Sequence, residues 1–224
     1  MDIFTLITSL FNKEKIDYWI DQGTLLSIIR DGEIKSNFIY HGEHEWHDDI
    51  DISIFSNQIQ KINKVTPEIL DWGYKLRTCY YMGKLFQYKF TPFDHKRNNI
   101  IDIKVYYDSK KDYYWSAKKK VRTTNLITRK LSRIIIDKWY YPSPSINIDK
   151  LPLSFIFTTL TWCLPKKLVF PLKYDYSKKI FLPNNVEGYL KHHFGDWKKK
   201  VDDWKSYRDD KALIHCTPEK FLKI

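Results

Sequence analysis

The sequence predicts an α/β (α+β) fold in which helices flank a mixed β-sheet and the C-terminal part is mainly helical. Over residues 1–110, segments with apolar residues at helical spacing interleave with short segments that are apolar or alternating. After residue 110 the longest apolar segment, residues 151–164, has the length of a core helix. We therefore expect one domain over residues 1–224, with a core over 1–110 and a helical portion over 111–224.

The first elements follow from apolar spacing and from residues that begin or end helices. Asp2 is a suitable N-cap residue, and apolar residues recur at helical spacing over residues 3–11. A short apolar strand over 18–20 comes next. A second helix over 24–30 follows, and Asp31-Gly32 ends it.

The later elements are assigned in the same way. Pro67 marks a break or a restart of the helix in which it lies. Residues 151–164 form a core helix in our interpretation, and an interfacial helix with basic flanks is the alternative. The other predicted elements are a loop over 33–46, a strand over 49–55, a helix over 57–72, hairpin strands over 74–81 and 84–91, a strand over 99–107 and a helix over 128–139.

The composition favours a folded protein with anionic partners. Hydrophobic residues make up 43% of the 224 residues and aromatic residues 17%, which argues against a disordered chain. The formal net charge of +11 favours nucleotide diphosphates, nucleic acid or an acidic membrane surface. The basic residues are scattered and match no helix-turn-helix, zinc-finger or single-strand-binding signature, so we expect no nucleic-acid partner.

Cysteine usage and hydropathy predict a cytoplasmic protein. Cys79, Cys163 and Cys216 are odd in number and widely spaced, which indicates free thiols in a reducing compartment. We expect no signal peptide, because the N-terminus is not basic, and no transmembrane helix, because the apolar runs are too short. Peripheral contact at the inner face of a membrane is a further option.

A strand with alternating acidic residues is the most informative stretch. In residues 49–55 the isoleucines take one face, whereas Asp49, Asp51 and Ser53 take the other. The two carboxylates then project side by side, about 7 Å apart along the strand. Like charges that close are costly to keep ionised. A divalent cation would neutralise them, and oxygen ligands suit Mg²⁺.

Motifs at both ends of the chain resemble those of one family. Residues 21–33, DQGTLLSIIRDGE, and 45–55, EWHDDIDISIF, resemble the signature of the LicD and fukutin-related family, D-x-G-T-L-L-G-x-x-R followed by W-D-x-D-x-D-I. Residues 181–200 resemble the closing motif of that family, from Pro183 to Trp197. A strand, a Gly-Thr turn, a helix and an Asp-x-Asp strand form the layout of nucleotidyltransferase-fold active sites. The resemblance implies a single LicD-like catalytic domain.

The resemblance also implies roles for individual residues. Gly23 would allow a tight turn, and Thr24 would open a helix whose free N–H groups hold an anion. Arg30 matches an arginine of the motif and could clamp a phosphate. Mg²⁺ is the implied cofactor, with Mn²⁺ as an alternative. The implied site comprises Asp49, Asp51 and Asp102 as catalytic and metal-binding residues, with Gly23, Thr24 and Arg30 as donor or phosphate-binding residues.

Asp102 is included because this fold supplies a third carboxylate from a neighbouring strand. It lies among β-branched residues in segment 100–105, where an aspartate is costly to bury unless paired or metal-bound. It could complete the magnesium site, serve as general base for the incoming hydroxyl, or form a salt bridge with a nearby Lys or Arg. Asp94 is a weaker alternative.

The roles of several other polar side chains stay open. Further phosphate contacts could come from Lys84, Lys89 or Arg122, and nothing in the sequence selects among them. Histidines occur at three-residue spacing from His41 to His47. They could share a zinc ion, but a titrating surface patch is the more common meaning of such spacing.

The resemblance implies metal-dependent transfer of a substituted, phosphocholine-like phosphate from a CDP-activated donor to a hydroxyl of a cell-surface glycan or glycolipid. The donor would be CDP-choline, or a CDP-ribitol or CDP-glycerol type compound. The acceptor would be a glycan or a lipid-linked glycan. The alternatives are a nucleotidyltransferase that moves the nucleotide itself, a nucleic-acid-binding module, and a non-catalytic member of the family.

Overall fold

The structure, a computed structural model, describes residues 2–32, 39–41, 44–46, 49–81, 83–93, 99–109, 111–121, 157–201, 204 and 206–223. The strands of its main sheet are β1 (Tyr18–Ile20), β4 (Ile50–Phe55), β5 (Tyr74–Tyr81), β6 (Lys84–Pro92), β7 (Ile101–Asp108), β8 (Tyr113–Val121), β9 (Phe157–Pro165) and β12 (Leu213–Ile214). Two small sheets pair β2 (Ile39–His41) with β3 (His44–Trp46) and β10 (Lys173–Asp175) with β11 (Ile180–Leu182). The helices are α1 (Ile3–Lys13), α2 (Gln22–Arg30), η1 (Ser56–Gln58), α3 (Ile59–Asp71), α5 (Lys166–Val169), α6 (Val186–Phe194), α7 (Ser206–Asp209) and α8 (Pro218–Lys223).

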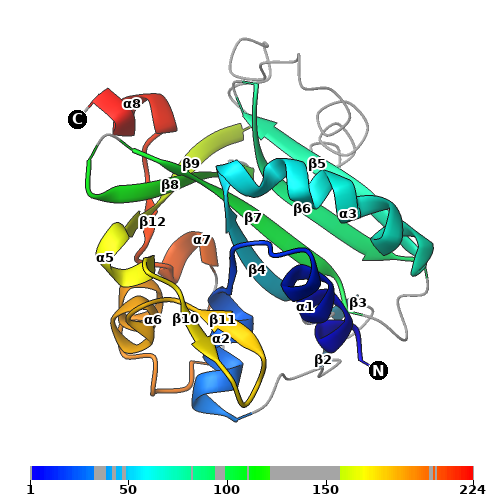
Figure 1. The fold of residues 1–224 in the computed structure, drawn as a ribbon. Helices are drawn as coiled ribbons and strands as arrows, with labels where there is room; N and C mark the ends of the chain where they lie inside the picture. The colour runs from blue at the N-terminus through cyan, green and yellow to red at the C-terminus, as the bar shows by residue number, and fades with distance from the viewer. Residues whose placement is uncertain are drawn as a thin grey trace.

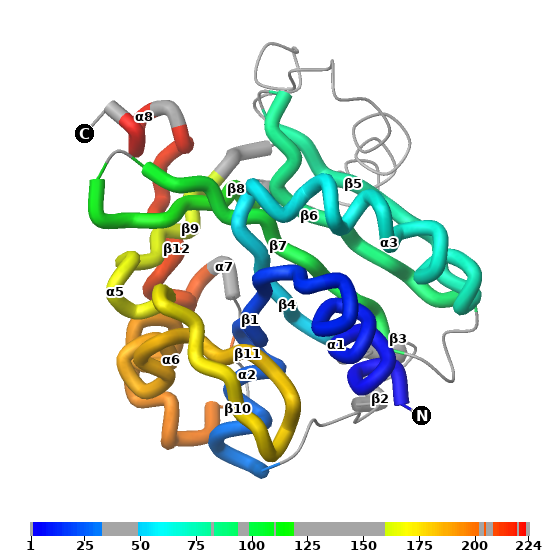
Figure 2. The backbone as a smooth tube through the Cα atoms, in the orientation of Figure 1, coloured from blue at the N-terminus to red at the C-terminus, as the bar shows by residue number. Residues whose placement is uncertain are grey.

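The main sheet is mixed and carries helices on its surface. Its strand order is β1-β4-β7-β8-β9-β12, and the β5–β6 hairpin joins it through β6. Figures 1 and 2 show α1 and α3 in front of β4, β6 and β7. Helices that flank a mixed sheet confirm the predicted fold class. Among the described residues, none of the helices has the length and apolar character needed to cross a membrane.

The predicted N-terminal elements are confirmed. Asp2 caps α1 by accepting a hydrogen bond from the Thr5 N–H at 2.9 Å. Strand β1 has the predicted bounds, and α2 ends at Arg30, where Gly32 adopts a positive φ of 78°. The hairpin of β5 and β6 and the strand β7 are also found at their predicted places.

Helix α2 begins earlier than predicted. Its N-cap is Asp21, whose carboxylate accepts from the Gln22 N–H, so Thr24 does not open the helix. Gln22, and not Gly23, takes the positive φ, at 40°. The aspartate caps the helix because its side-chain oxygen satisfies an N–H that the first turn leaves unpaired.

Strand pairing fixes the register that matters for the site. Strands β4 and β7 run parallel, with Ile52 opposite Ile103 and Asp51 opposite Asp102. The isoleucines are fully buried in the core between the sheet and the helices. Since side chains alternate along a strand, the aspartates lie on the opposite face.

Three sequence-based expectations for local structure are wrong. Helix α3 continues through Pro67 without a break. The segment predicted as a loop over 33–46 contains the short β2–β3 hairpin. Residues 157–165 form β9 rather than the end of a core helix. Leu160 and Thr161 are both buried, so both faces of β9 are covered, and a strand covered on both faces has no alternation that distinguishes it from a buried helix.

The described part of residues 111–224 is mixed, not mainly helical. Strands β8, β9 and β12 extend the main sheet, and the helices of this part are short. The predicted helix over 128–139 lies outside the described residues. The basic and aromatic composition of this part concealed its strands, because β-propensity depends on packing partners more than on composition.

Helix α6 ties the C-terminal part of the chain to its beginning. The Tyr189 hydroxyl donates to Asp21 Oδ1 at 2.5 Å and accepts from Trp19 Nε1 at 3.1 Å. All three side chains are fully buried. The hydroxyl is therefore the acceptor for the buried Trp19 N–H and one of the donors to the buried Asp21 carboxylate.

We expect Tyr189→Phe to lower the free energy of unfolding by about 1–3 kcal/mol, because it leaves a buried N–H and a buried carboxylate short of a partner. Urea unfolding followed by circular dichroism measures this change. The control is Tyr176→Phe, since the Tyr176 side chain is 84% exposed and its hydroxyl has little to lose. Equal stability of the two variants would contradict the assigned role of the Tyr189 hydroxyl.

Candidate active site

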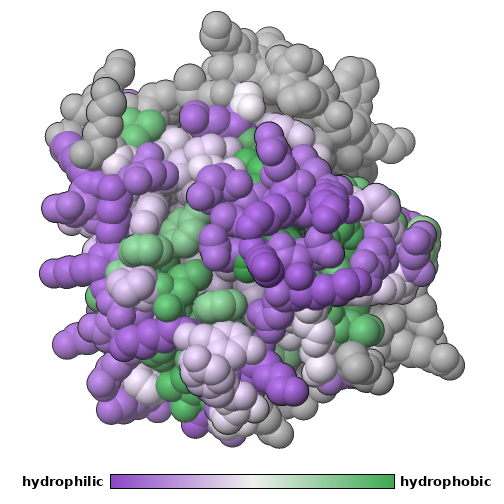
Figure 3. Space-filling view, viewed as in Figure 1, coloured by the Kyte–Doolittle hydropathy of each residue, from purple (hydrophilic) through white to green (hydrophobic). Residues whose placement is uncertain are grey.

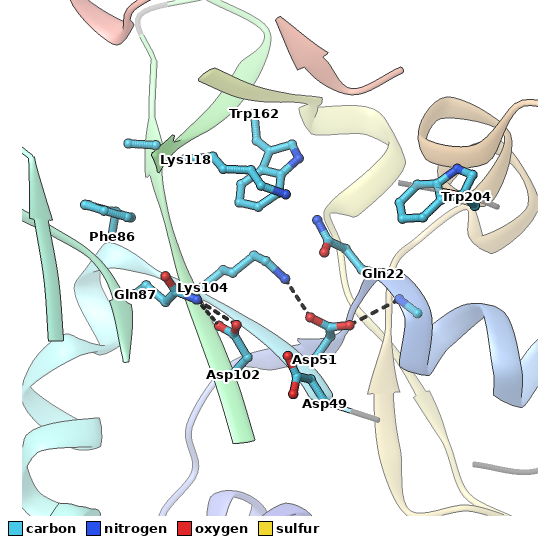
Figure 4. A pocket seen from close by; sticks show the side chains of 12 residues that line it. Gln22, Asp49, Asp51, Phe86, Gln87, Asp102, Lys104, Lys118, Trp162 and Trp204 are labelled. Atoms are coloured by element: carbon cyan, nitrogen blue, oxygen red, sulfur yellow. Dashed lines mark hydrogen bonds and ion pairs between the residues drawn. The ribbon is translucent and has the colours of Figure 1, made fainter. Parts of the chain in front are cut away.

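Three carboxylates from neighbouring strands face one cavity of about 340 Å³. Asp49 directly precedes β4, Asp51 lies in β4, and Asp102 lies in β7. The parallel register puts Asp51 and Asp102 side by side across the two strands. Figure 4 shows the three carboxylates close together at one end of the cavity. The structure therefore brings together the three acids that the sequence predicts.

Asp102 is held in place by an amide. Gln87 on β6 donates its Nε2 to both oxygens of Asp102 at 2.6 Å. Asp102 is only 7% exposed, so this contact supports a carboxylate that burial would otherwise penalise. Gln87 also lines the cavity and was not identified from the sequence.

Lysines supply positive charge beside the acids. Lys104 Nζ lies 2.8 Å from Asp51 Oδ1, and Lys89 Nζ lies 3.6 Å from Asp49 Oδ2. Lys104 is 3% exposed, which is rare for a lysine and reflects its ion pair. It follows Asp102 by two residues on β7 and so shares its face of the sheet. That spacing was visible in the sequence, and it could have identified Lys104 as a site residue.

Burial and crowding disfavour the charged forms of Asp49 and Asp51. Burial, opposed by Lys89 and reinforced by Asp102, raises the pKa of Asp49 to about 7. Burial also raises the pKa of Asp51, although Lys104 opposes the shift. For Lys104, burial acts to lower the pKa, but Asp51 and other acids outweigh it and raise the pKa. The acids thus stabilise a positive charge in the cavity, and the Lys104 ammonium supplies one.

The acids match a hard divalent cation in chemistry but are engaged by other groups. Carboxylate oxygens are the ligands that Mg²⁺ prefers. Asp51 Oδ1 accepts from Lys104, and its Oδ2 accepts from the Gly23 N–H at 3.3 Å. Over the part of the chain that the structure covers, no group of three or more His, Cys, Asp or Glu is arranged to hold a metal ion. The donor set fits Mg²⁺ provided that the Lys104 ammonium moves away from Asp51.

Gly23 and Thr24 secure α2 to the acidic strand. The Thr24 hydroxyl donates to the Asp49 carbonyl oxygen at 3.1 Å and accepts from the Asp51 N–H at 2.8 Å. Gly23 lines the cavity, and a Cβ there would lie 3.4 Å from Asp51 Oδ2. These contacts position the carboxylates, and they engage the hydroxyl of Thr24, a residue for which the resemblance implies phosphate binding.

The other predicted phosphate contacts are dispersed. Arg30 forks onto Asp31, with Nε and Nη2 each 3.1 Å from a carboxylate oxygen, and does not line the cavity. Lys84 Nζ lies 4.7 Å from the centroid of the Tyr107 ring. The phosphate-binding role of Arg30 remains a prediction that this arrangement does not support. Arg122, Asp94 and His47 fall outside the described residues.

Asp21, which the sequence analysis did not assign, joins the elements that surround the site. Its carboxylate is fully buried and accepts from the Ser53 hydroxyl at 2.5 Å and from Tyr189. It also caps α2 through the Gln22 N–H. One buried side chain therefore fixes the start of α2 against β4 and against α6.

A tryptophan held from behind forms another wall of the cavity. Trp162 on β9 donates its Nε1 to Asp210 Oδ2 at 3.1 Å. Asp210 also contacts His193 Nδ1 at 3.0 Å, and both of these side chains are fully buried. Burial acts to lower the pKa of His193, but Asp210 outweighs it and raises the pKa. Burial acts to raise the pKa of Asp210, but His193 outweighs it and lowers the pKa.

The site has carboxylates on paired strands of a mixed sheet, beside the start of a helix. This arrangement is typical of nucleotidyltransferase-fold enzymes. Residues 15–155 match the family model described as LicD/FKTN/FKRP, nucleotidyltransferase domain. The match spans more than half of the chain, and the chain belongs to this family. A comparison with curated proteins finds no match. Family membership indicates a transferase that acts in phosphotransfer or glycan modification in general.

The His193–Asp210 pair makes stability depend on pH. The folded pKa of His193 is above its ordinary value of 6.5, so its contribution is complete below pH 6.5 and is lost as the pH rises through the folded pKa. The folded pKa of Asp210 is below its ordinary value of 3.8, so its contribution is complete above pH 3.8 and is lost as the pH falls through the folded pKa.

We expect Asp210→Asn to destabilise the protein most between pH 3.8 and 6.5, where the wild-type pair is fully charged. The loss there should be about 3 kcal/mol, because removal of one partner leaves a buried charge. Denaturant unfolding over a series of pH values measures it. Asp209→Asn is the control, since that carboxylate pairs with Arg208 in a more exposed salt bridge. A difference from wild type that is constant with pH would contradict the charged pair.

Proposed function

We propose that this protein transfers a substituted, phosphocholine-like phosphate from a CDP-activated donor to a hydroxyl of a cell-surface glycan or glycolipid, and that the reaction depends on Mg²⁺ or Mn²⁺. The observation that carries the proposal is the convergence of Asp49, Asp51 and Asp102 on one cavity beside the start of α2. Membership in the LicD/FKTN/FKRP family supports the same reaction class.

The residues of the cavity supply both signs of charge. Asp49, Asp51 and Asp102 would hold the metal, which when bound neutralises charge on the phosphate under attack and on the departing CMP. Asp102 is the candidate general base for the acceptor hydroxyl, and Gln87 fixes its orientation. Lys104, on its flexible stem, can turn from Asp51 towards a phosphate oxygen.

The proposed donors are CDP-choline and CDP-ribitol or CDP-glycerol type compounds. The proposed acceptor is a glycan or a lipid-linked glycan. The net charge of +11 favours anionic ligands, and it would suit peripheral contact with the inner face of a membrane from the cytoplasm. We propose no nucleic-acid partner.

A nucleotidyltransferase that moves the nucleotide itself is the second candidate, because the same acids could serve it. Incubation with labelled CDP-choline or CTP in the presence of a glycan separates the two reactions. We expect release of CMP and a phosphorylated glycan from CDP-choline. Release of pyrophosphate from CTP, with the nucleotide joined to the acceptor, would reject phosphotransfer in favour of the second candidate.

We expect Asp51→Asn to lower kcat/KM for transfer by about a thousandfold, because it removes a charged metal ligand worth several kcal/mol to the transition state. Steady-state kinetics with CDP-choline at saturating Mg²⁺ measure the effect, and circular dichroism checks the fold. Asp71→Asn, on the exposed end of α3, is the control and should keep wild-type kinetics. Wild-type turnover in Asp51→Asn would remove the assignment.

A further inference from the structure

Two lysine ammonium groups lie against one tryptophan ring in the cavity. Lys118 Nζ is 4.5 Å and Lys104 Nζ is 5.3 Å from the centroid of the Trp162 ring. Lys118 on β8 and Trp162 on β9 are diagonal neighbours across the strand pair, because Lys118 faces Leu160 and Trp162 faces Ser116. Figure 4 shows Lys118 and Trp162 at the end of the cavity opposite the carboxylates, with Lys104 between.

The ammonium groups of Lys104 and Lys118 repel each other at this end of the cavity. Burial, reinforced by the charge of Lys104, lowers the pKa of Lys118 to about 8. Lys104 is balanced by Asp51, with which it forms an ion pair. An anion bound near the Trp162 ring would reduce the repulsion between the two ammonium groups.

Buried hydrogen-bond donors line the same cavity. Gln22 Nε2 and Trp204 Nε1 are both buried without a hydrogen-bond partner among the described residues, and both side chains line the cavity. A buried donor without an acceptor is costly, so a ligand rich in acceptors would gain from both groups. Phosphate oxygens only accept hydrogen bonds, whereas a lysine only donates them.

Contacts within the protein hold Trp162 and Trp204 in place. Trp162 is fixed through Asp210, which in turn contacts His193 and accepts from the Ala212 N–H at 3.0 Å. The Trp204 ring packs on the Phe194 ring at a centroid distance of 5.0 Å. Binding at such a wall loses little conformational entropy, which favours affinity.

We propose that Lys104, Lys118 and the buried donors of Gln22 and Trp204, which line one cavity, form a binding site for a diphosphate group. This deepens the proposed function and rests on it in one respect, namely that the natural diphosphate is that of the CDP-linked donor. A cavity of about 340 Å³ suits a small ligand rather than a polymer. Two ammonium groups near one ring match two linked phosphates better than they match a single carboxylate.

Inorganic pyrophosphate is the probe, because it carries the diphosphate without a base or a head group. Isothermal titration calorimetry of the full chain in EDTA should detect its binding. Lys118→Met keeps much of the side-chain stem but removes the charge, and we expect it to weaken pyrophosphate binding by about tenfold or more. Lys118→Arg should retain most of the affinity. The control Lys64→Met removes the charge of a side chain that is 74% exposed, and this variant should bind pyrophosphate as the wild type does.

Chemical modification tests the same site in the wild-type protein, and it does so even if the variants fold poorly. Acetic anhydride should acylate Lys118 readily because its pKa is low. Pyrophosphate should protect Lys118, but not Lys64, as read by mass spectrometry. Unchanged labelling of Lys118 under saturating pyrophosphate, no binding by the wild type, or equal affinity in Lys118→Met would each overturn the proposal.

Failure of this inference and failure of the proposed function give different results. Transfer from CDP-choline by the wild type, together with wild-type pyrophosphate affinity in Lys118→Met, would reject the diphosphate site alone. Pyrophosphate binding that depends on Lys118, without transfer from any CDP-linked donor, would support the site and reject the proposed reaction.

Discussion

The parallel register of β4 and β7 is the constraint on which the site depends. It places Asp51 beside Asp102, although two carboxylates at the spacing of neighbouring strands repel each other. The register itself is fixed by the buried isoleucines on the other face, since a slip of one residue would expose them. Packing of the hydrophobic core thus brings two carboxylates together on the opposite face of the sheet. The Lys104 ammonium, paired with Asp51, offsets their repulsion.

The site is braced by residues from beyond the segment that matches the family. That match ends at residue 155, yet Trp162, Tyr189 and Asp210 all support the cavity or the elements around it. Tyr189 reaches back to Asp21, which sets the start of α2. The start of α2 therefore depends on the C-terminal part of the chain as well as on its own N-cap.

Local patterns predicted the acids but not their partners. The alternation in residues 49–55 and the apolar setting of Asp102 selected the carboxylates together with the resemblance to the LicD family, because each of these two signals lies within a single strand. Thr24 was selected for a different role, since only the tertiary structure shows its hydroxyl bonded to β4. Strand β9 and its Trp162 were missed because a fully covered strand lacks alternation, and pairing between β8 and β9 is a long-range property.

The charges of the cavity suggest that metal and donor would bind together. Lys89 and Lys104 pair with Asp49 and Asp51, and Lys118 lies at the opposite end of the cavity, so three ammonium groups stand against three carboxylates in the absence of ligands. A divalent cation alone would leave an excess of positive charge, and a diphosphate alone would leave an excess of negative charge. Binding of both restores the match, with carboxylates on the metal and ammonium groups on phosphate oxygens. Because an unpaired buried charge is costly, each ligand should strengthen the binding of the other, and by linkage the two effects are equal.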